Sequence, residues 1–286
     1  MSISGAAKIA GVMGWPITHS VSPALHGYWL AENGIDGALI PLGVRPEDFS
    51  TVLMALRKAG FVGVNVTVPH KQAAFALADI CDPAARAAGA ANLLVFHEDG
   101  RIEGRNTDAA GLRESLKEGL GNRLAGKTVA LLGAGGAARG AVLALADHGV
   151  AAIHVLNRHE DRARALCEAL APAVPCRLDA GGLEDWERAA GDAALLVNAT
   201  SAGMNGRNLL DLKIEALPKD AAVSDMVYSP LQTDLLRRAR ARGLLGLDGL
   251  GMLMHQAAPS FEAFFGVKPK VSPGLRTAME RDLYRG

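Results

Sequence analysis

The chain has 286 residues, which at roughly 150 residues per domain predicts about two domains. Hydrophobic residues make up 49% of the chain and charged residues 21%, a balance that excludes an intrinsically disordered protein. The 30 basic side chains equal the 30 acidic ones and aromatic residues reach only 5%, so neither a basic excess nor an aromatic platform indicates nucleic-acid binding.

Short apolar runs alternate with longer Ala- and Leu-rich stretches in the first part of the chain. Ser22 is expected to cap its helix, with Pro23 at the first helical position. The alternation predicts an α/β fold with largely parallel sheets. In chain order, the predicted elements are strands at 9–14, 38–44 and 61–68, helices from Ser22 to Leu30, at 46–60 and at 71–79, and a strand-turn-strand at 92–104.

A second series of the same kind begins at Gly126. Its connections are short, as in βαβ units, so we expect a parallel sheet with helices between the strands. From Gly249 onward the chain is expected to be helical. The predicted strands are 128–133, 151–158, 195–200 and 222–228, and the predicted helices follow a glycine turn within 133–149 and occupy 159–170.

The cysteine pattern and the N-terminus indicate where the protein is expected to act. The three cysteines, Cys81, Cys167 and Cys176, are odd in number and show no C-x-x-C spacing, which fits neither a disulfide framework nor a zinc site. The N-terminus lacks the pattern of a signal peptide, and no uncharged apolar stretch reaches about 18 residues. We therefore expect a cytoplasmic protein with no metal site, no membrane span and no nucleic-acid partner.

The run TVALLGAGGAARGAVLAL contains a G-x-G-x-x-A pattern formed by Gly133, Gly135 and Ala138. The pattern directly follows an apolar strand and directly precedes a helix, the context in which it indicates a dinucleotide-binding loop. Gly133 would permit the tight turn, and the missing side chain of Gly135 would let a pyrophosphate reach the free N–H groups of the helix start. An ordinary glycine turn in an α/β domain is the alternative.

The next predicted strand ends in Asn157-Arg158, and Arg162 follows one helical turn later. An NAD site usually has an acidic residue here, whereas Arg suits the dianionic 2′-phosphate of NADP through bidentate hydrogen bonds. The sequence therefore predicts NADP rather than NAD. Glu160 and Asp161 are expected to face solvent at the start of the helix, where they favour its dipole.

Polar residues also gather where the strands of the first half end. Singly, each has an ordinary explanation, such as a helix cap, a turn residue or a surface lysine. Two serines near a predicted helix start could bind one small anion with their hydroxyls and the free N–H groups of that helix. The residues concerned are Ser20, Ser22, Asn65, Thr67, Lys71, Asn92 and Asp108.

Several short segments between about Gly11 and Gly266, taken in order along the chain, together resemble the shikimate dehydrogenase family. HSVSP, NVTVPHK and NTD are the most specific of them. The resemblance implies a substrate-binding domain of residues 1–107 and 250–286, with the C-terminal helices packing back on it, and a Rossmann-like NADP-binding domain of residues 108–249. The matching segments are GWPITHSVSPALH, GVNVTVPHK, GAANLL, GRNTDAAG, GAGGAARGA, NR with Arg162 after it, NATSAGM, DMVYSPLQTDLL and GLGMLMHQA.

The resemblance implies reversible, NADP-dependent reduction of 3-dehydroshikimate to shikimate in aromatic amino acid (chorismate) biosynthesis, by a monomer or homodimer. Lys71 and Asp108 would form the catalytic pair and share the transferred proton. The implied substrate contacts are Ser20, Ser22 and Tyr228 around the carboxylate, and Asn65, Thr67, Asn92 and Gln256 around the ring hydroxyls. The implied cofactor contacts are Gly133, Ala134, Gly135, Gly136, Ala137, Asn157, Arg158, Arg162, Thr200, Met204, Met226, Gly249 and Met252.

Three departures from the family pattern stand out: Gly27 after His26, His159 after Arg158, and Phe264 or Phe265 where Trp is common. We expect them to affect domain shape, NADP selectivity and packing, respectively. A quinate/shikimate dehydrogenase remains an alternative, although such relatives often carry an acidic residue where Arg158 stands. A non-catalytic NADP-binding sensor is a second alternative, but it would not need the catalytic pair. A methylenetetrahydrofolate dehydrogenase would share the two-domain layout but not HSVSP or NVTVPHK.

Overall fold

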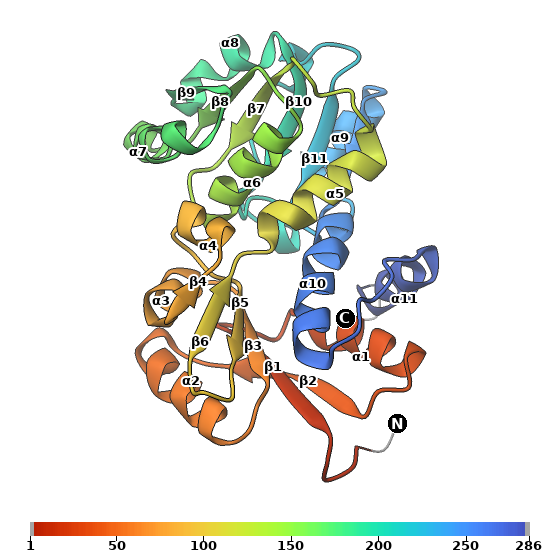
Figure 1. Cartoon of the computed structure of the whole chain (residues 1–286). Helices are drawn as coiled ribbons and strands as arrows, with labels where there is room; N and C mark the ends of the chain where they lie inside the picture. The colour runs from red at the N-terminus through yellow and green to blue at the C-terminus, as the bar shows by residue number, and fades with distance from the viewer. Residues whose placement is uncertain (1–2, 284–286) are drawn as a thin grey trace. The chain divides into compact units, whose positions relative to one another are not determined.

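The computed structural model describes residues 3–283, and the chain divides into two compact units (Figure 1). The first unit takes the chain up to Thr107 and again from Gln256, and the second unit is Asp108–His255. Each unit contains one six-stranded sheet, so the predicted two-part α/β organisation is confirmed, including the return of the C-terminal helices to the first unit.

The sheet of the first unit is mixed, with strand order β2-β1-β3-β5-β6-β4. Strand β1 runs parallel to β2 and β3, whereas β5 is antiparallel to both β3 and β6. Three of the five strand pairs are parallel, β1 with β2, β1 with β3 and β4 with β6, so the sheet is largely parallel as predicted. The pair β5–β6 is the predicted strand-turn-strand, whose short turn can join only antiparallel strands. The strands are β1 Lys8–Gly14, β2 Gly37–Gly43, β3 Gly63–Val66, β4 Ile80–Cys81, β5 Leu93–Phe96 and β6 Ile102–Arg105.

Helices cover this sheet, and their apolar faces build the core of the unit. Phe49, Leu53 and Ala74, from α2 and α3, pack with Val64 and Val66 of β3. Helix α1 packs against the C-terminal segment: the indole of Trp29 lies 5.3 Å from the ring of Phe261, centroid to centroid, and its N–H donates to the Lys270 carbonyl. The helices are α1 Ser22–Glu32, α2 Phe49–Lys58, α3 Lys71–Leu77, α4 Pro83–Ala88, the later turns of α10 Gly249–Phe265, and α11 Pro273–Leu283.

The sheet of the second unit is parallel throughout, with order β12-β11-β10-β7-β8-β9, as predicted. Its central strand β7 is apolar on both faces: Val129 and Leu131 face one helical layer, and Ala130 and Leu132 face the other. The strands are β7 Thr128–Leu132, β8 Ala152–Leu156, β9 Arg177–Gly181, β10 Ala193–Asn198, β11 Ala222–Asp225 and β12 Leu245–Leu247.

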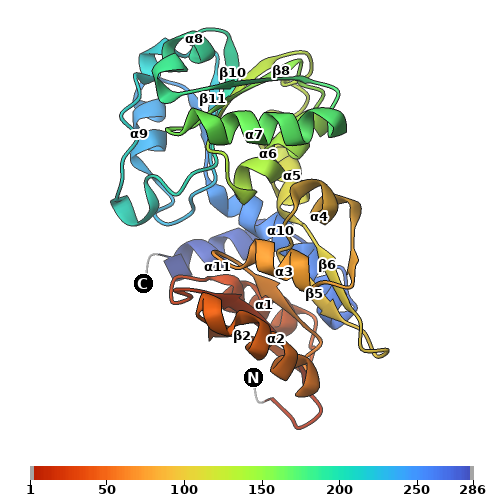
Figure 2. The ribbon, with the colours of Figure 1, turned by 90° about the vertical axis from the view of Figure 1, so that its left-hand side faces the viewer.

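Helices α5, α6 and α7 pack on one face of this sheet, and α8 and α9 pack on the other; Figure 2 shows α6 and α7 lying side by side. The strand order reverses at β7, which has β8 on one side and β10 on the other. Ligands of such sheets bind outside the carboxyl ends of the strands at this switch point. The helices are α5 Asp108–Leu120, α6 Gly136–Asp147, α7 Glu160–Leu170, α8 Trp186–Ala190 and α9 Asp234–Ala241. No helix among residues 3–283 is both long and apolar enough to cross a membrane.

Candidate active site

The predicted substrate residues of the first unit share one edge of its sheet. Strands β1, β3 and β6 end at this edge, and β5 begins there because it runs antiparallel to β3 and β6. The loop after β3 is joined to the end of β1 by a backbone hydrogen bond from Thr67 N–H to the Met13 carbonyl, and to the loop after β1 by one from Trp15 N–H to the Val68 carbonyl. The topology thus gathers segments from residue 14 to residue 107 into one region.

Asn92, Thr107 and Gln256 form a hydrogen-bonded cluster at this edge. The amide nitrogen of Asn92 donates to the Thr107 hydroxyl at 2.9 Å and to Gln256 Oε1 at 3.2 Å. Its carbonyl oxygen accepts the Thr107 backbone N–H at 2.8 Å, and the Thr107 hydroxyl reaches the Gln256 backbone carbonyl at 2.9 Å. Asn92 and Thr107 are buried, so these bonds fix the orientation of both amide side chains.

Lys71 stands at the first position of α3, directly beside this cluster in the backbone. Its carbonyl accepts the N–H of Ala91 at 2.9 Å, which ties the start of α3 to the residue before Asn92. The side chain of Lys71 is half-buried. Asp108, the other member of the predicted catalytic pair, follows Thr107 in the chain, begins α5 of the second unit and is buried.

Asn65 is buried near the end of β3, and its backbone neighbour Val66 donates to the Asn92 carbonyl at 2.8 Å. Its side-chain nitrogen lies 3.5 Å from Nε2 of His26, whereas its side-chain oxygen is buried without a hydrogen-bond partner among the described residues. A buried acceptor without a partner costs about 1–3 kcal/mol, and a hydroxyl group of a bound ligand would satisfy it. Thr67 is half-buried and lies one residue beyond β3, so the predicted strand 61–68 is too long.

The predicted role of Ser22 as helix cap is wrong. Helix α1 begins at Ser22 itself, the cap position belongs to Val21, and no side chain makes a capping hydrogen bond there. The Ser20 hydroxyl instead accepts the Ser22 backbone N–H, at a long 3.4 Å. The cap residue Val21 therefore offers no side-chain acceptor to the first N–H groups of α1. The hydroxyls of Ser20 and Ser22 belong to the same helix start.

The glycine loop after β7 has the geometry of a phosphate cradle. Gly133 adopts a φ of +110°, and a Cβ placed on it would lie 3.0 Å from the Ala199 carbonyl oxygen, so this position requires glycine for the fold itself. A Cβ on Gly135 or Gly136 would meet no protein atom within 4 Å. Helix α6 begins at Gly136 without a side-chain cap, so its first N–H groups are available to an anion.

These observations fit a dinucleotide pyrophosphate. No contact within the protein requires glycine at 135 or 136, and the missing side chains leave room for a pyrophosphate to approach the backbone. Ala134 and Ala137 are half-buried in the same turn and pack on the core of the unit. Ala138, the third position of the motif, is completely buried and lets α6 approach the sheet closely.

Arg158 and Arg162 are exposed beyond the end of β8, and Asn157 precedes them half-buried. Among residues 3–283, no carboxylate lies within ion-pair distance of either guanidinium. Glu160 instead pairs with Arg164, at 2.6 Å between Oε1 and Nη2, as expected for a residue that faces solvent. Both arginines are therefore available to a phosphate group.

The remaining predicted cofactor contacts come from loops at the carboxyl edge of the second sheet. Thr200 follows β10, Met226 follows β11, and Met204 is 46% exposed on the loop between them. A Cβ on Gly249 would lie 2.5 Å from the Met226 carbonyl oxygen, which explains the glycine at the start of α10. Met252, like Met226, packs on the core.

Tyr228 lies in the second unit, whereas Ser20 and Ser22 lie in the first. Burial raises the pKa of the Tyr228 hydroxyl, so the group stays protonated and able to donate a hydrogen bond at neutral pH.

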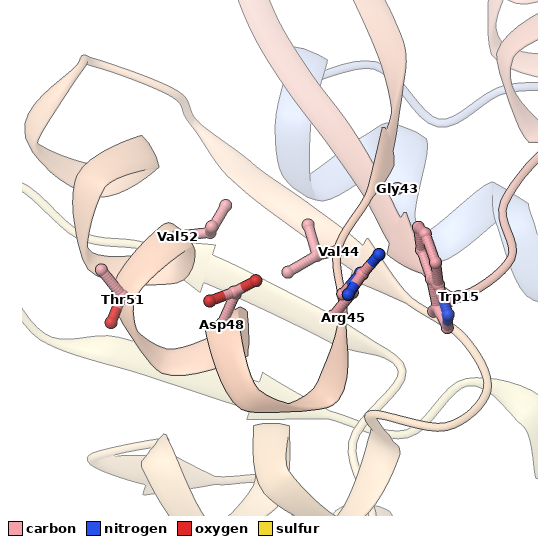
Figure 3. Close-up of a pocket in the computed structure, with 7 residues that line it drawn as sticks. All are labelled: Trp15, Gly43, Val44, Arg45, Asp48, Thr51 and Val52. Carbon is pink, nitrogen blue, oxygen red and sulfur yellow. The ribbon is translucent and has the colours of Figure 1, made fainter.

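Two other polar features of the first unit contain none of the predicted site residues. A surface cavity of about 370 Å³ is lined by residues including Trp15, Arg45 and Asp48, with the Arg45 guanidinium 5.4 Å from the Trp15 ring centroid (Figure 3). It contains none of the predicted site residues. Within residues 3–283, no group of three or more His, Cys, Asp or Glu side chains could hold a metal ion.

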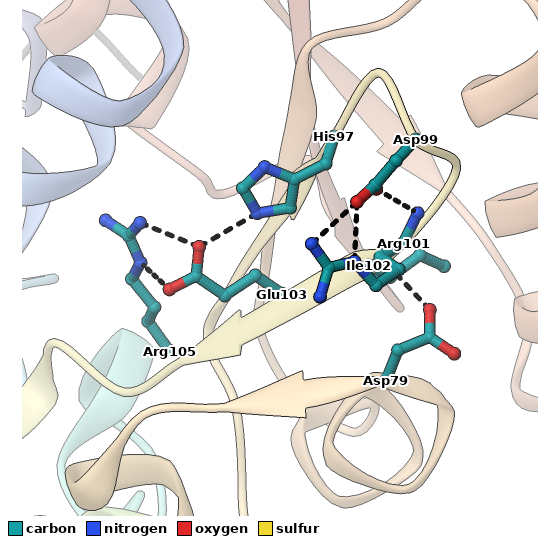
Figure 4. Close-up of polar contacts among 7 residues, drawn as sticks. All are labelled: Asp79, His97, Asp99, Arg101, Ile102, Glu103 and Arg105. Carbon is teal, nitrogen blue, oxygen red and sulfur yellow. Dashed lines mark hydrogen bonds and ion pairs between the residues drawn. The ribbon is translucent and has the colours of Figure 1, made fainter.

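Charged residues along the β5–β6 hairpin form the second feature (Figure 4). Glu103 accepts two hydrogen bonds from Arg105, at 2.7 and 2.8 Å, and one of its oxygens lies 3.0 Å from His97 Nε2. The hydrogen bonds from Arg105 are the main reason why the pKa of Glu103 is lowered. We interpret this network as a support for β6, the strand that leads into Thr107.

The sequence did not single out three residues that the structure connects to the predicted site: His26, Thr107 and Asp225. His26 and Thr107 stood within quoted motifs, but neither was given a role. Asp225 is completely buried at the end of β11. A carboxylate at the end of an otherwise apolar strand was the available signal for it.

Family models match most of the chain. The Shikimate dehydrogenase substrate binding domain matches residues 12–94, Shikimate / quinate 5-dehydrogenase matches 115–208, and the Shikimate 5'-dehydrogenase C-terminal domain matches 249–279.

Individual relatives extend over nearly the whole chain. A Shikimate dehydrogenase (NADP(+)) of Paramagnetospirillum magneticum is 53% identical over 279 residues, covering 96% of this chain and 98% of that protein. The Thermus thermophilus shikimate 5-dehydrogenase, solved with NADP(H) and shikimate, is 38% identical with a TM-score of 0.83, covering 97% of this chain and 99% of that one. A Corynebacterium glutamicum quinate dehydrogenase solved with NAD is 33% identical with a TM-score of 0.88, covering 96% and 98%. The chain belongs to the shikimate dehydrogenase family.

Proposed function

We propose that the protein catalyses the reversible, NADP-dependent reduction of 3-dehydroshikimate to shikimate, as a step in aromatic amino acid biosynthesis. The observation that carries this proposal is the cluster of Asn92, Thr107 and Gln256 beside the start of α3, in a chain 53% identical to a Shikimate dehydrogenase (NADP(+)). Two oriented amide side chains suit a ligand with several ring hydroxyls, because an amide both donates and accepts.

In this proposal, the first unit binds the substrate and the second binds NADP. Ser20 and Ser22 hold the substrate carboxylate at the start of α1, and Tyr228 contributes its hydroxyl. The ring hydroxyls are bound by Asn65, Thr67, Asn92 and Gln256. The unsatisfied oxygen of Asn65 supports its assignment as an acceptor for one of them.

The proposed chemistry uses Lys71 and Asp108 as one pair. NADPH, when bound, supplies the hydride that reduces the ring carbonyl carbon. Negative charge then develops on the carbonyl oxygen, and the Lys71 ammonium stabilises that charge as a hydrogen-bond donor. The pair delivers a proton to this oxygen in reduction and removes it in oxidation.

The cofactor assignment is supported by the glycine cradle at the start of α6 and by the two exposed arginines after β8. The cradle residues Gly133, Gly135 and Gly136 would bind the pyrophosphate with Ala134 and Ala137. Arg158 and Arg162 would bind the 2′-phosphate beside Asn157. The nicotinamide end would contact Thr200, Met204, Met226, Gly249 and Met252.

A spectrophotometric comparison at 340 nm tests the proposal. Shikimate and quinate are each offered with NADP and with NAD, and shikimate with NADP is expected to give the highest kcat/KM. Preference for quinate with NAD would instead assign the activity of the Corynebacterium glutamicum relative. Binding of NADPH without turnover of either acid would support a non-catalytic sensor.

We also propose a cytoplasmic location and a monomeric or homodimeric state. The free thiols of Cys81, Cys167 and Cys176 support a reducing compartment. Burial raises the pKa of Cys167 to about 11, which keeps that thiol unreactive at neutral pH. Light scattering of the purified protein tests the oligomeric state, and fractionation of the cells tests the location.

A further inference from the structure

Asp225 is a completely buried carboxylate at the last position of β11. One of its oxygens accepts the Asn198 side-chain N–H at 2.9 Å and the Val227 backbone N–H at 3.0 Å, and the other accepts the Thr233 hydroxyl at 2.6 Å. Among residues 3–283, no lysine, arginine or histidine pairs with it. A buried carboxylate without a cationic partner is costly, and burial raises the pKa of Asp225 accordingly.

The Asp225 carboxylate orients the loop that follows β10. Asn198 lies directly opposite Asp225 in the parallel pair of strands. Because its side-chain nitrogen is bound to Asp225, its oxygen points to Thr200, where it accepts the backbone N–H at 3.1 Å and the hydroxyl at 2.7 Å. The Thr200 hydroxyl in turn accepts the Ala202 N–H at 3.1 Å.

The same carboxylate orients the loop that follows β11. The bond to Val227 fixes the first turn of that loop, and the bond to Thr233 fixes its end, where the Thr233 hydroxyl also accepts the Leu236 N–H and so caps α9. The two loops meet directly, because Asn205 N–H donates to the Ser229 carbonyl at 2.9 Å.

Loops 199–206 and 226–233 carry Thr200, Met204, Met226 and Tyr228, four of the residues assigned above to the cofactor and substrate. We propose that Asp225 is a positioning residue, which holds these two loops in the arrangement that receives the nicotinamide half of NADP. This inference rests on the proposed function. It explains why a costly buried carboxylate is kept where an apolar side chain would pack: one carboxylate satisfies donors from both loops at once.

The test separates the two halves of the cofactor. Adenosine 2′,5′-bisphosphate (2′,5′-ADP) reports only on the adenine side, whereas NADPH also engages the nicotinamide side. The variant Asp225→Leu removes every acceptor at similar volume. We expect its affinity for 2′,5′-ADP, by calorimetry, to stay within about twofold of wild type. Its kcat for shikimate oxidation should fall at least about tenfold, the worth of one hydrogen bond to a charged group.

The conservative variant Asp225→Asn should retain more activity than Asp225→Leu. Its oxygen can still accept from Asn198 and Val227, and its amide nitrogen can face the Thr233 hydroxyl. The matched control is Asp234→Asn. Asp234 also stands at the start of α9, where it pairs with Arg237 and Arg238, but it bonds neither loop. The control should keep the wild-type kcat, and an equal loss in it would assign the effect to α9 and overturn the proposal.

The proposal would also be overturned if the Asp225→Leu variant binds 2′,5′-ADP and keeps the wild-type kcat and the wild-type affinity for NADPH. If Asp225→Leu loses 2′,5′-ADP binding, the proposal is tested with Thr233→Val and Thr233→Ser, of which only the serine variant keeps the hydroxyl. A lower kcat in the valine variant than in the serine variant supports the proposal. Equal kcat values in the two variants overturn it. Failure of the proposed function is a separate result. A wild-type protein that binds NADPH but does not oxidise shikimate would refute that function. The role of Asp225 would then be tested by comparing the affinities of wild type and Asp225→Leu for NADPH and for 2′,5′-ADP.

Discussion

Nε2 of His26 lies 3.5 Å from the side-chain nitrogen of Asn65, and both residues are buried inside the first unit. The His26 ring is surrounded by the aromatic rings of Trp29, Phe261, Phe264 and Phe265, at centroid distances of 5.7–6.3 Å. Burial in these apolar surroundings lowers the pKa of His26 to about 3. The imidazole is therefore neutral at physiological pH, and it fixes the amide beside it.

This histidine predicts how stability depends on pH. The pKa of His26 is about 3 in the folded state and about 6.5 in the unfolded state, so below pH 6.5 the unfolded chain binds more protons. Stability should fall as pH decreases below 6.5, by up to about 1.4 kcal/mol per pH unit from this residue. Melting temperatures between pH 4.5 and 8 measure the slope. His26→Phe should flatten it, and the exposed control His159→Ala should leave it unchanged.

Lys71→Ala tests the catalytic pair. Loss of a positioned general acid should lower kcat at least about 100-fold, while the affinity for NADPH stays near that of wild type. Stopped-flow measurement of hydride transfer should show the same loss. The control Lys58→Ala removes an exposed lysine at the end of α2 and should be silent. A folded Lys71→Ala protein with wild-type turnover would remove Lys71 from the mechanism.

Arg158→Ala tests the 2′-phosphate contact. The affinity for NADP should fall much more than that for NAD, because only NADP carries this phosphate, and the difference should shrink as salt rises. Arg164→Ala is the control, since Arg164 lies on α7 but is paired with Glu160. Equal weakening of NADP and NAD would mean that Arg158 binds another part of the cofactor.

Ser20→Ala tests how the substrate carboxylate is held. A charge-assisted hydrogen bond is worth roughly 1.5–3 kcal/mol, so the KM for shikimate should rise about 10- to 150-fold. The melting temperature should change little, since the bond from Ser22 N–H to Ser20 is long. Thr18→Ala, which changes an exposed residue of the same loop, serves as control. An unchanged KM in Ser20→Ala would show that the carboxylate is bound elsewhere.

Thr107→Val tests the amide cluster. Valine keeps the shape but removes the hydroxyl that accepts from Asn92 and donates to the Gln256 carbonyl. With the two amides released, kcat/KM for shikimate should fall at least about tenfold, and Thr107→Ser should recover most of it. Equal values for the valine and serine variants would show that the hydroxyl does not orient the amides.

Local patterns in the sequence were sufficient for the four central strands of the second unit, but not for its edge strands β9 and β12. The central strands are buried on both faces and appear as apolar runs such as Val129–Leu132, whereas β9 and β12 are partly exposed and give no such run. The glycine at 133 was likewise predictable, because a φ of +110° is a local requirement that few other residues meet. The resemblance of whole motifs supplied the family and the order of the candidate site residues.

Other features depended on contacts between distant segments. The antiparallel pairing of β5 with β3 and the exact start of α1 follow from pairing and packing, which a short window of sequence does not encode. The amide of Asn92 meets Gln256 across 164 positions, and Asp225 is buried only because Asn198 and Thr233 converge on it. Local propensity and periodicity thus determined most of the elements and the glycine loop, but not the strands β4, β9 and β12. Only the tertiary structure decided which polar groups are desolvated and what each one bonds, because burial and hydrogen bonding depend on neighbours that are far apart in the chain.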